Sequence, residues 1–278
     1  MALLGLRRGT GQVRPLESPL TATHVDRTGA LAADEAVRLN GANGGALARQ
    51  VSSPWTRADR LMGKWSCYLV FALGLAYVPT MVAGFVAVGG LSAPIPDPYQ
   101  AAMELMILLL APALVVAFAA LHRYASPSGK TLSLSALVLV ALMAGITICV
   151  HFVVLTVGRQ ANETTLPGFG LLFSWTWPSM IYALDIAAWD FCLGLALLLV
   201  APVFSGSRLA RWVRYGAILS GVLCLAGIAG AVLGNMTYRD IGILGYGGVL
   251  PVVALLMGRL FSRTPASDEQ SFSPRLAA

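Results

Sequence analysis

Four ionisable side chains lie inside long apolar runs, where a membrane helix would carry them into lipid. They are Glu104, His151, Asp185 and Asp190. A charged group at the centre of a bilayer costs at least about 2.5–3.5 kcal/mol, and the predicted spans offer no Lys or Arg at this depth to offset it. Such residues therefore mark a candidate site for protons, cations or a polar solute that arrives from outside.

The depth of each side chain follows from its place in its apolar run. At a rise of about 1.5 Å per residue, His151 and Asp185 both lie about 9 Å below the outer boundary. They belong to consecutive helices, which we expect to be neighbours, so the two residues are predicted to pair. Glu104 is shallower, at about 5 Å, and Asp190 lies about 16 Å deep with no partner that we identify. Because five residues turn an α-helix by about 140°, Asp185 and Asp190 are not expected to face one narrow site.

Three interpretations of these groups remain open at this stage. The first is purely structural: His151 and Asp185 form one interhelical hydrogen bond, worth about 0.6 kcal/mol, and Asp190 caps a polar group elsewhere. The second is a proton- or cation-handling site in a small transporter or channel-like protein. The third is a metal or hydrolytic site, which is weak because zinc normally takes more His or Cys ligands than this region offers.

No motif in the chain points to catalysis. There is no nucleophile elbow, HExxH sequence, Walker loop or dinucleotide fingerprint. We therefore expect no enzymatic activity, no cofactor and no metal. The alternative to a transporter is a non-catalytic membrane subunit or sensor that acts through contacts between helices.

Composition identifies the solvent of this chain as lipid. Of its 278 residues, 57% are hydrophobic and 12% are charged, against about 25% charged in soluble domains. The sequence predicts an all-α, polytopic membrane protein, a bundle of six transmembrane helices, because six runs reach the roughly 20 apolar residues that a span needs. These runs cover about 66–88, 101–121, 133–157, 179–203, 213–234 and 241–261. The net charge of +6 does not indicate nucleic-acid binding, since the basic residues form no cluster with interleaved aromatics.

Basic residues set the expected orientation. Of the 19 Lys and Arg residues, 17 fall on one side of the predicted bundle, and only Arg159 and Arg239 fall on the other. Lys and Arg collect on the cytoplasmic side of membrane proteins, so both termini are predicted to be cytoplasmic. Short loops and an Ala-, Gly- and Arg-rich composition suggest a bacterial inner membrane.

The six spans occupy one domain, predicted at residues 61–263. Residues 1–60 lack a regular hydrophobic period and are predicted to form a disordered, basic cytoplasmic tail. Met62 is an alternative start, because Met62-Gly63-Lys64-Trp65 leads directly into the first span. Residues 264–278 are predicted to form a short cytoplasmic tail.

The fifth helix carries small residues at spacings that allow helix backbones to approach closely. The helix-packing candidates are Gly216, Ser220, Gly227, Gly230 and Gly234. They predict tight packing, either within the chain or against a second copy or a partner membrane subunit.

Overall fold

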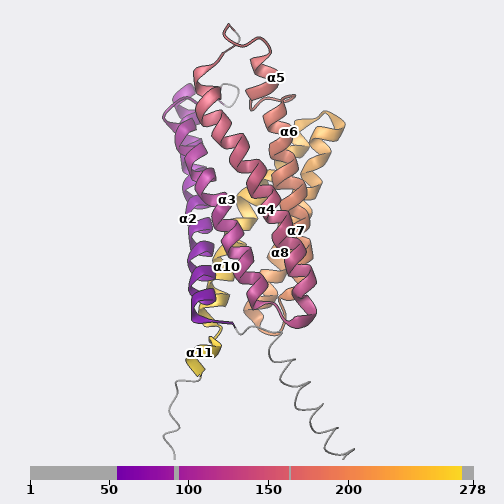
Figure 1. Ribbon diagram of the computed structural model, residues 1–278. Helices are drawn as coiled ribbons and strands as arrows, with labels where there is room; N and C mark the ends of the chain where they lie inside the picture. The colour runs from indigo at the N-terminus through magenta and orange to yellow at the C-terminus, as the bar shows by residue number, and fades with distance from the viewer. Residues whose placement is uncertain (1–54, 91–93, 163, 271–278) are drawn as a thin grey trace, which may run out of the picture. The chain divides into compact units, whose positions relative to one another are not determined.

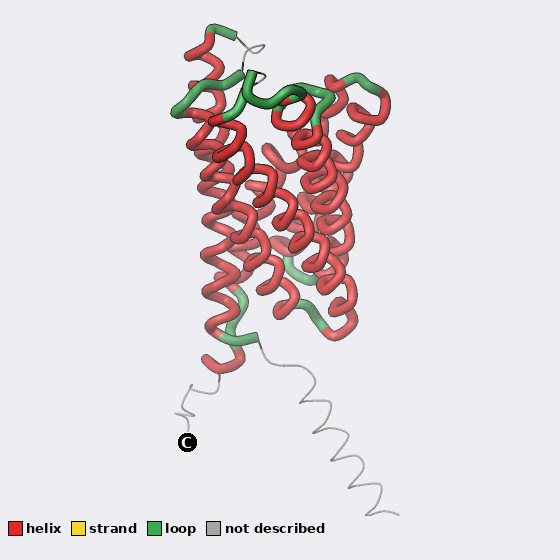
Figure 2. Tube along the Cα trace, turned by 45° about the horizontal axis from the view of Figure 1, so that its top comes forward, coloured by secondary structure: helices red, strands yellow, loops and turns green. Residues whose placement is uncertain are grey.

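Among the residues that the structure describes, six helices are long and apolar enough to cross a membrane, which confirms the predicted six-span, all-α bundle. The computed structural model describes residues 55–90, 94–162 and 164–270, and none of these residues forms a strand (Figure 2). The spans are Arg57–Val88, Tyr99–Tyr124, Pro127–Gly158, Met180–Val203, Arg208–Leu233 and Met236–Arg263. Residues 1–54 and 271–278, which hold most of both predicted tails, lie outside the described residues.

Three of the spans begin and end as single α-helices. They are α2 (Arg57–Val88), α3 (Tyr99–Tyr124) and α8 (Arg208–Leu233). Pro79 and Pro112 lie within α2 and α3, and both helices continue through them.

The other three spans each contain a π-helical segment. In the third span, the 3₁₀ turn η1 (Pro127–Gly129) and α4 (Lys130–Val153) lead into the π-helix η2 (Val154–Gly158). The fourth span consists of α6 (Met180–Ile186), the π-helix η3 (Ala187–Leu193), α7 (Gly194–Val200) and the turn η4 (Ala201–Val203). The sixth consists of the turn η5 (Met236–Tyr238), α9 (Arg239–Ile243), the π-helix η6 (Leu244–Val249) and α10 (Leu250–Arg263). π-helical turns inside α-helices occur frequently at functional sites.

The helices form a closed ring in sequence order (Figure 1). Each of α2, α3, α4, α7, α8 and α10 packs on the next, and α10 packs back on α2. The ring encloses an apolar core that includes Phe118, Leu121 and Phe204, each at most 2% exposed. The short helix α5 (Phe169–Phe173) lies at the end opposite α11 (Ser267–Gln270). We call the end with α5 outer and the end with α11 inner.

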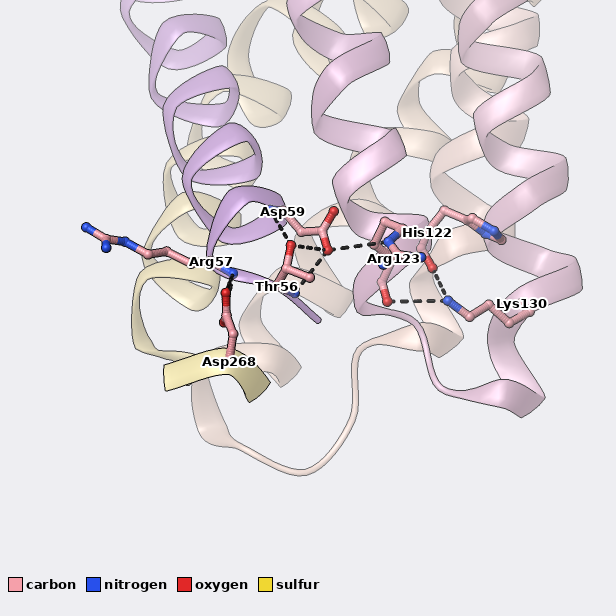
Figure 3. A network of polar contacts seen from close by, with 7 residues as sticks. All are labelled: Thr56, Arg57, Asp59, His122, Arg123, Lys130 and Asp268. Atoms are coloured by element: carbon pink, nitrogen blue, oxygen red, sulfur yellow. Dashed lines mark hydrogen bonds and ion pairs between the residues drawn. The ribbon is translucent and has the colours of Figure 1, made fainter. Parts of the chain in front are cut away.

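A polar network holds the inner ends of the helices together (Figure 3). Thr56 caps α2, and its N–H and hydroxyl donate to the Asp59 carboxylate over 3.0 and 2.8 Å. The same carboxylate accepts from Arg123 Nε on α3 at 3.4 Å. On the other side, the N–H of Arg57 donates to the carboxylate of Asp268 on α11 at 3.1 Å. The network therefore joins the first two spans to the C-terminal segment.

Aromatic packing adds to this network and extends the folded part of the chain. The Trp55 ring lies 5.7 Å from Tyr124 and 5.4 Å from Phe261, measured between ring centroids. The structure thus places 55–60, predicted as the end of the tail, within the bundle. A chain that began at Met62 would lack the Thr56 cap and the Trp55 contacts.

Replacing the cap residue tests this inner network. Thr56→Ala removes the hydroxyl that accepts from the Asp59 N–H at 3.2 Å, and the loss of such a cap costs about 1 kcal/mol. We expect a lower midpoint of thermal unfolding, followed by the reaction of the buried thiols of Cys67 and Cys224 with a maleimide dye. Thr176→Ala, in the exposed outer loop, is the matched control and should leave the midpoint unchanged. Equal midpoints for the two variants would show that the cap does not hold the fold.

Candidate functional site

The four ionisable residues predicted to form a site come from four different elements of the outer half. Glu104 lies on α3, His151 on α4, Asp185 on α6 and Asp190 on η3. Their residues are 2%, 6%, 8% and 0% exposed, respectively. All four are thus buried in a region where neither water nor lipid can solvate a charge.

His151 joins two of the carboxylates. Its Nδ1 forms a short contact with Oε2 of Glu104, and its Nε2 lies 3.6 Å from Oδ1 of Asp185. The expected His151–Asp185 pair is therefore present, but Glu104 is the closer partner. The second oxygen of Glu104 accepts a hydrogen bond from the side-chain amide of Gln100, one turn earlier on α3.

Arg239 is the group that sequence reasoning placed wrongly. We expected it in the outer loop, but it is the first residue of α9, lies within the sixth span and is 1% exposed. Its Nη1 lies 3.2 Å from Oδ2 of Asp190, and its Nη2 lies 3.4 Å from Oδ2 of Asp185. Nη2 also donates to the Tyr246 hydroxyl at 2.8 Å. The expectations that Asp190 lacks a partner and that no cation offsets the carboxylates are both wrong.

A signal for this placement does exist in the sequence. The Asn235 side chain accepts from the Thr237 N–H at 3.2 Å and so caps the turn η5. Asn is a preferred residue at helix N-termini. A span that begins at this Asn, and not at residue 241, includes Arg239.

The π-helix η3 explains how one guanidinium reaches both aspartates. In an α-helix these residues, five apart, would point about 140° away from each other. The i→i+5 hydrogen bonding of a π-helix instead stacks residues five apart along the axis. This widened segment begins directly after α6, between Asp185 and Asp190. The expectation that the two face different directions is therefore wrong, and both reach Arg239.

Glycines supply the space for these charged groups. A Cβ atom on Gly242 would lie 2.0 Å from Oδ1 of Asp190, and one on Gly227 would lie 2.9 Å from the same oxygen. A Cβ on Gly230 would lie 2.7 Å from the backbone nitrogen of Arg239. Two of the predicted packing residues on α8 thus make room for the buried ion pairs.

The other packing candidates lie at three different kinds of position. Gly216 faces α10, where an added Cβ would lie 2.7 Å from Val253. Ser220 donates to the Gly245 carbonyl at 2.8 Å. Gly234 caps the end of α8 with φ of 67°, a left-handed conformation that favours glycine. Apart from Gly234, these residues contact the sixth span of the same chain; the predicted contact with a second copy or partner subunit stays a prediction.

Aromatic rings surround the charged groups on the outer side. The Trp175 ring packs on His151 with the centroids 5.3 Å apart. Tyr182 lies next to Trp175 at 6.2 Å and to Trp177 at 6.4 Å. The Arg239 guanidinium carbon lies 5.8 Å from the centre of the Tyr182 ring. A continuous series of rings thus leads from the outer loop to the buried arginine.

Negative charge exceeds positive charge in this group. We define the charged cluster as Glu104, His151, Asp185, Asp190 and Arg239. When all three carboxylates are ionised, they face one permanent cation and one histidine, so even a protonated His151 leaves a net charge of −1. Burying an uncompensated charge is strongly unfavourable, so full ionisation of the three carboxylates would require one more positive charge beside them.

Hydrogen bonding within the cluster is also incomplete. Arg239 Nε is buried without a hydrogen-bond partner, and His151 Nε2 and Asp190 Oδ2 make only the ion-pair contacts of 3.6 and 3.2 Å. Unsatisfied buried polar atoms are rare in folded proteins. Among the described residues, no group of three or more His, Cys, Asp or Glu has an arrangement that would hold a metal ion.

The fold and site together define an integral membrane protein with six spans and a buried, charge-unbalanced cluster in its outer half. A scan of protein-family models and searches of curated proteins and of solved structures find no match to this chain.

A glycine substitution tests the space around Asp190. Gly242→Ala should cost about 1–3 kcal/mol, typical of overpacking a tight site, because its Cβ would collide with the carboxylate. Gly248→Ala is the matched control, since its Cβ would meet nothing within 4 Å. The thiol-reactivity assay measures both, and the cost should shrink when Asp190→Ser removes the bulk of the carboxylate. A persistent cost in that background would place the collision elsewhere.

A double-mutant cycle tests the ion pair itself. Arg239→Gln leaves two buried carboxylates without their cation, and such a loss typically costs about 3–5 kcal/mol. Combined with Asp190→Asn, it should cost clearly less than the sum of the two single changes. Arg159→Gln breaks an outer-surface pair with Asp97 and should cost at most about 1 kcal/mol. Additive costs for Arg239 and Asp190 would rule out the pairing.

Proposed function

We propose that this membrane protein is a small proton-coupled transporter and that the charged cluster is its proton-binding site. The observation that carries the proposal is the charge imbalance: three buried carboxylates share one arginine and one histidine. Ionisable groups inside transmembrane segments mark ion pathways and proton relays. A cluster that lacks one positive charge takes up a proton when nothing else neutralises it.

A chain of contacts gives the proton a route between groups. It passes from Glu104 through the two ring nitrogens of His151 to Asp185. Arg239 keeps its own protons and holds Asp185 and Asp190 beside this route. A histidine can release a proton from one nitrogen while it accepts another on the second. The cluster is therefore able to pass a proton between Asp185 and Glu104 by way of His151.

The distribution of apolar residues supports access from the outer side. On the inner side the ring is filled by residues that include Leu121, Val200 and Phe204, each 1% exposed. A small cavity there has a wholly apolar lining, which includes Phe118 and Met257. Among the described residues, those that line this cavity offer no polar side chain to a proton, whereas Asp185 and His151 retain slight exposure near the outer end.

A purely structural role accounts less well for the same contacts. A structural hydrogen bond between helices needs one donor and one acceptor, both satisfied. The cluster instead holds an excess of acceptors and buried polar atoms that make no hydrogen bond. The alternative of a membrane subunit or sensor that acts through α8 stays a prediction, as does a bacterial inner membrane.

Proton flux through reconstituted protein tests the proposal. Proteoliposomes that contain a pH dye are given a K⁺ diffusion potential with valinomycin, and the initial rate of internal acidification is measured. Asp185→Asn and His151→Gln should each slow this rate about tenfold or more. A tenfold slower rate corresponds to an activation free energy that is higher by about 1.4 kcal/mol.

Asp240→Asn is the matched control, because Asp240 follows Arg239 on α9 but is exposed. Its flux should equal that of the unchanged protein. All variants are first shown to unfold at similar temperatures. The proposal would be falsified if Asp185→Asn and His151→Gln vesicles acidified as fast as those with the unchanged protein.

A further inference from the structure

The geometry points to an organic cation as the transported solute, exchanged for a proton at Asp185 between the rings of Trp175, Trp177 and Tyr182. This inference rests on the proposed function and names its substrate class. It depends on three features of the outer half: the aromatic series, the environment of Arg239 and the missing positive charge of the cluster.

The aromatic series lies where a solute from outside would meet the cluster. Trp175 and Trp177 belong to the outer loop and are partly exposed, and Tyr182 lies below them on α6. Asp185 follows Tyr182 by three residues, so the two side chains share one face of the helix. The faces of Trp and Tyr rings attract cations, and a carboxylate at the end of such a series adds direct charge attraction.

Arg239 shows that this environment accepts an organic cation. Its guanidinium is a flat, delocalised cation that lies 5.8 Å from the Tyr182 ring centre and 5.3 Å from that of Tyr246. The same group forms ion pairs with Asp185 and Asp190. A quaternary ammonium or guanidinium solute would need the same two kinds of partner, a ring face and a carboxylate.

Unsatisfied atoms mark where such a solute would complete the site. Nε2 of His151, on a residue that is 6% exposed, makes no hydrogen bond and has only its contact with Asp185. Oδ1 of Asp185 is held only by this longer contact of 3.6 Å. The more exposed carboxylate of the pair that binds Arg239 therefore retains capacity for another cation.

Charge balance makes the solute and the proton competitors. One monovalent cation neutralises the cluster as well as one proton does, and both together would overcompensate. The exchange changes no covalent bond other than an O–H bond: the carboxylic acid gives its proton to water as the cation takes its place. An anionic solute would instead add to the excess negative charge, which disfavours it.

Five further polar side chains face the cluster and do not change its net charge. They are Tyr77 on α2, Gln100 on α3, Tyr182 on α6, Cys224 on α8 and Tyr246 on η6. None of them carries a permanent charge, so they do not supply the missing positive charge.

The experiment uses permanently charged probes, which cannot carry protons across a membrane by themselves. Proteoliposomes with a pH dye inside are held at equal pH and at zero potential, with equal K⁺ and valinomycin. Tetramethylammonium, tetraethylammonium or methylguanidinium chloride is then added outside. We expect the interior to become alkaline with at least one of these probes, as the cation moves in and a proton moves out.

Substitutions connect this signal to the proposed residues. Asp185→Asn should abolish the alkalinisation. Tyr182→Leu should raise the half-saturating probe concentration about 3- to 30-fold, which corresponds to the loss of one cation–π contact, whereas Tyr182→Phe should keep it near that of the unchanged protein. Phe169→Leu, which removes a ring of α5 that packs on Phe173, is the matched control.

The outcomes separate this inference from the function on which it rests. If the potential-driven proton flux depends on Asp185 but none of the three cations alkalinises the interior, the cation assignment is overturned and the proton site stands. Alkalinisation that is unaffected by Tyr182→Leu and Asp185→Asn also overturns it. Loss of flux in every assay rejects the transporter itself.

Discussion

The ion pairs of Arg239 with Asp185 and Asp190 impose the constraint on which the outer half of this protein depends. A guanidinium that is 1% exposed within a membrane span is tolerable only if carboxylates lie against it. That requirement explains several otherwise unrelated local features. The fourth span widens into η3 so that two aspartates five residues apart reach one cation. The backbones of α8 and α9 must then lie close together, and the glycines of both helices make this possible.

The two ends of the bundle solve different physical problems. At the inner end, the charged groups lie near the boundary, where Asp59 accepts from Thr56 and Arg123 in an arrangement with no excess of buried charge. The outer end holds its charges deep in the bundle and leaves them unbalanced. Because all three π-helical segments also lie in the outer half, the spans that carry the cluster are less regular there than at the clamped inner end.

The sequence predicted the six spans well because the length of an apolar run is a direct consequence of the thickness of the bilayer. It also found Glu104, His151, Asp185 and Asp190, since lone charges in apolar runs are conspicuous. Their partners were harder to find. Depth estimated along straight helices put Glu104 about 4 Å above His151, yet the two side chains are in contact. Packing shifts of this size are invisible to a count of residues.

Arg239 escaped prediction for a related reason. It precedes the sixth apolar run by two residues, and hydropathy assigns such a position to the loop. A charged residue can nevertheless lie inside a bundle when its neighbours carry the opposite charge, so hydropathy alone underestimates how far a span extends. The same reasoning limits the use of helical periodicity for Asp185 and Asp190, because hydrogen-bond register, and not sequence spacing alone, sets which residues share a face.

The positions of the charges indicate which helix contact would respond to a proton or cation bound at the cluster. His151 and Asp185 meet across the boundary between α4 and α6, so protonation or cation binding at this point changes the attraction between two spans. The Glu104–His151 and Arg239–Asp190 pairs lie on either side of that boundary. We therefore expect the α4–α6 contact, under the Trp175 ring, to be the part of the bundle whose packing responds to the occupant of the site, while the inner network keeps the same helices together.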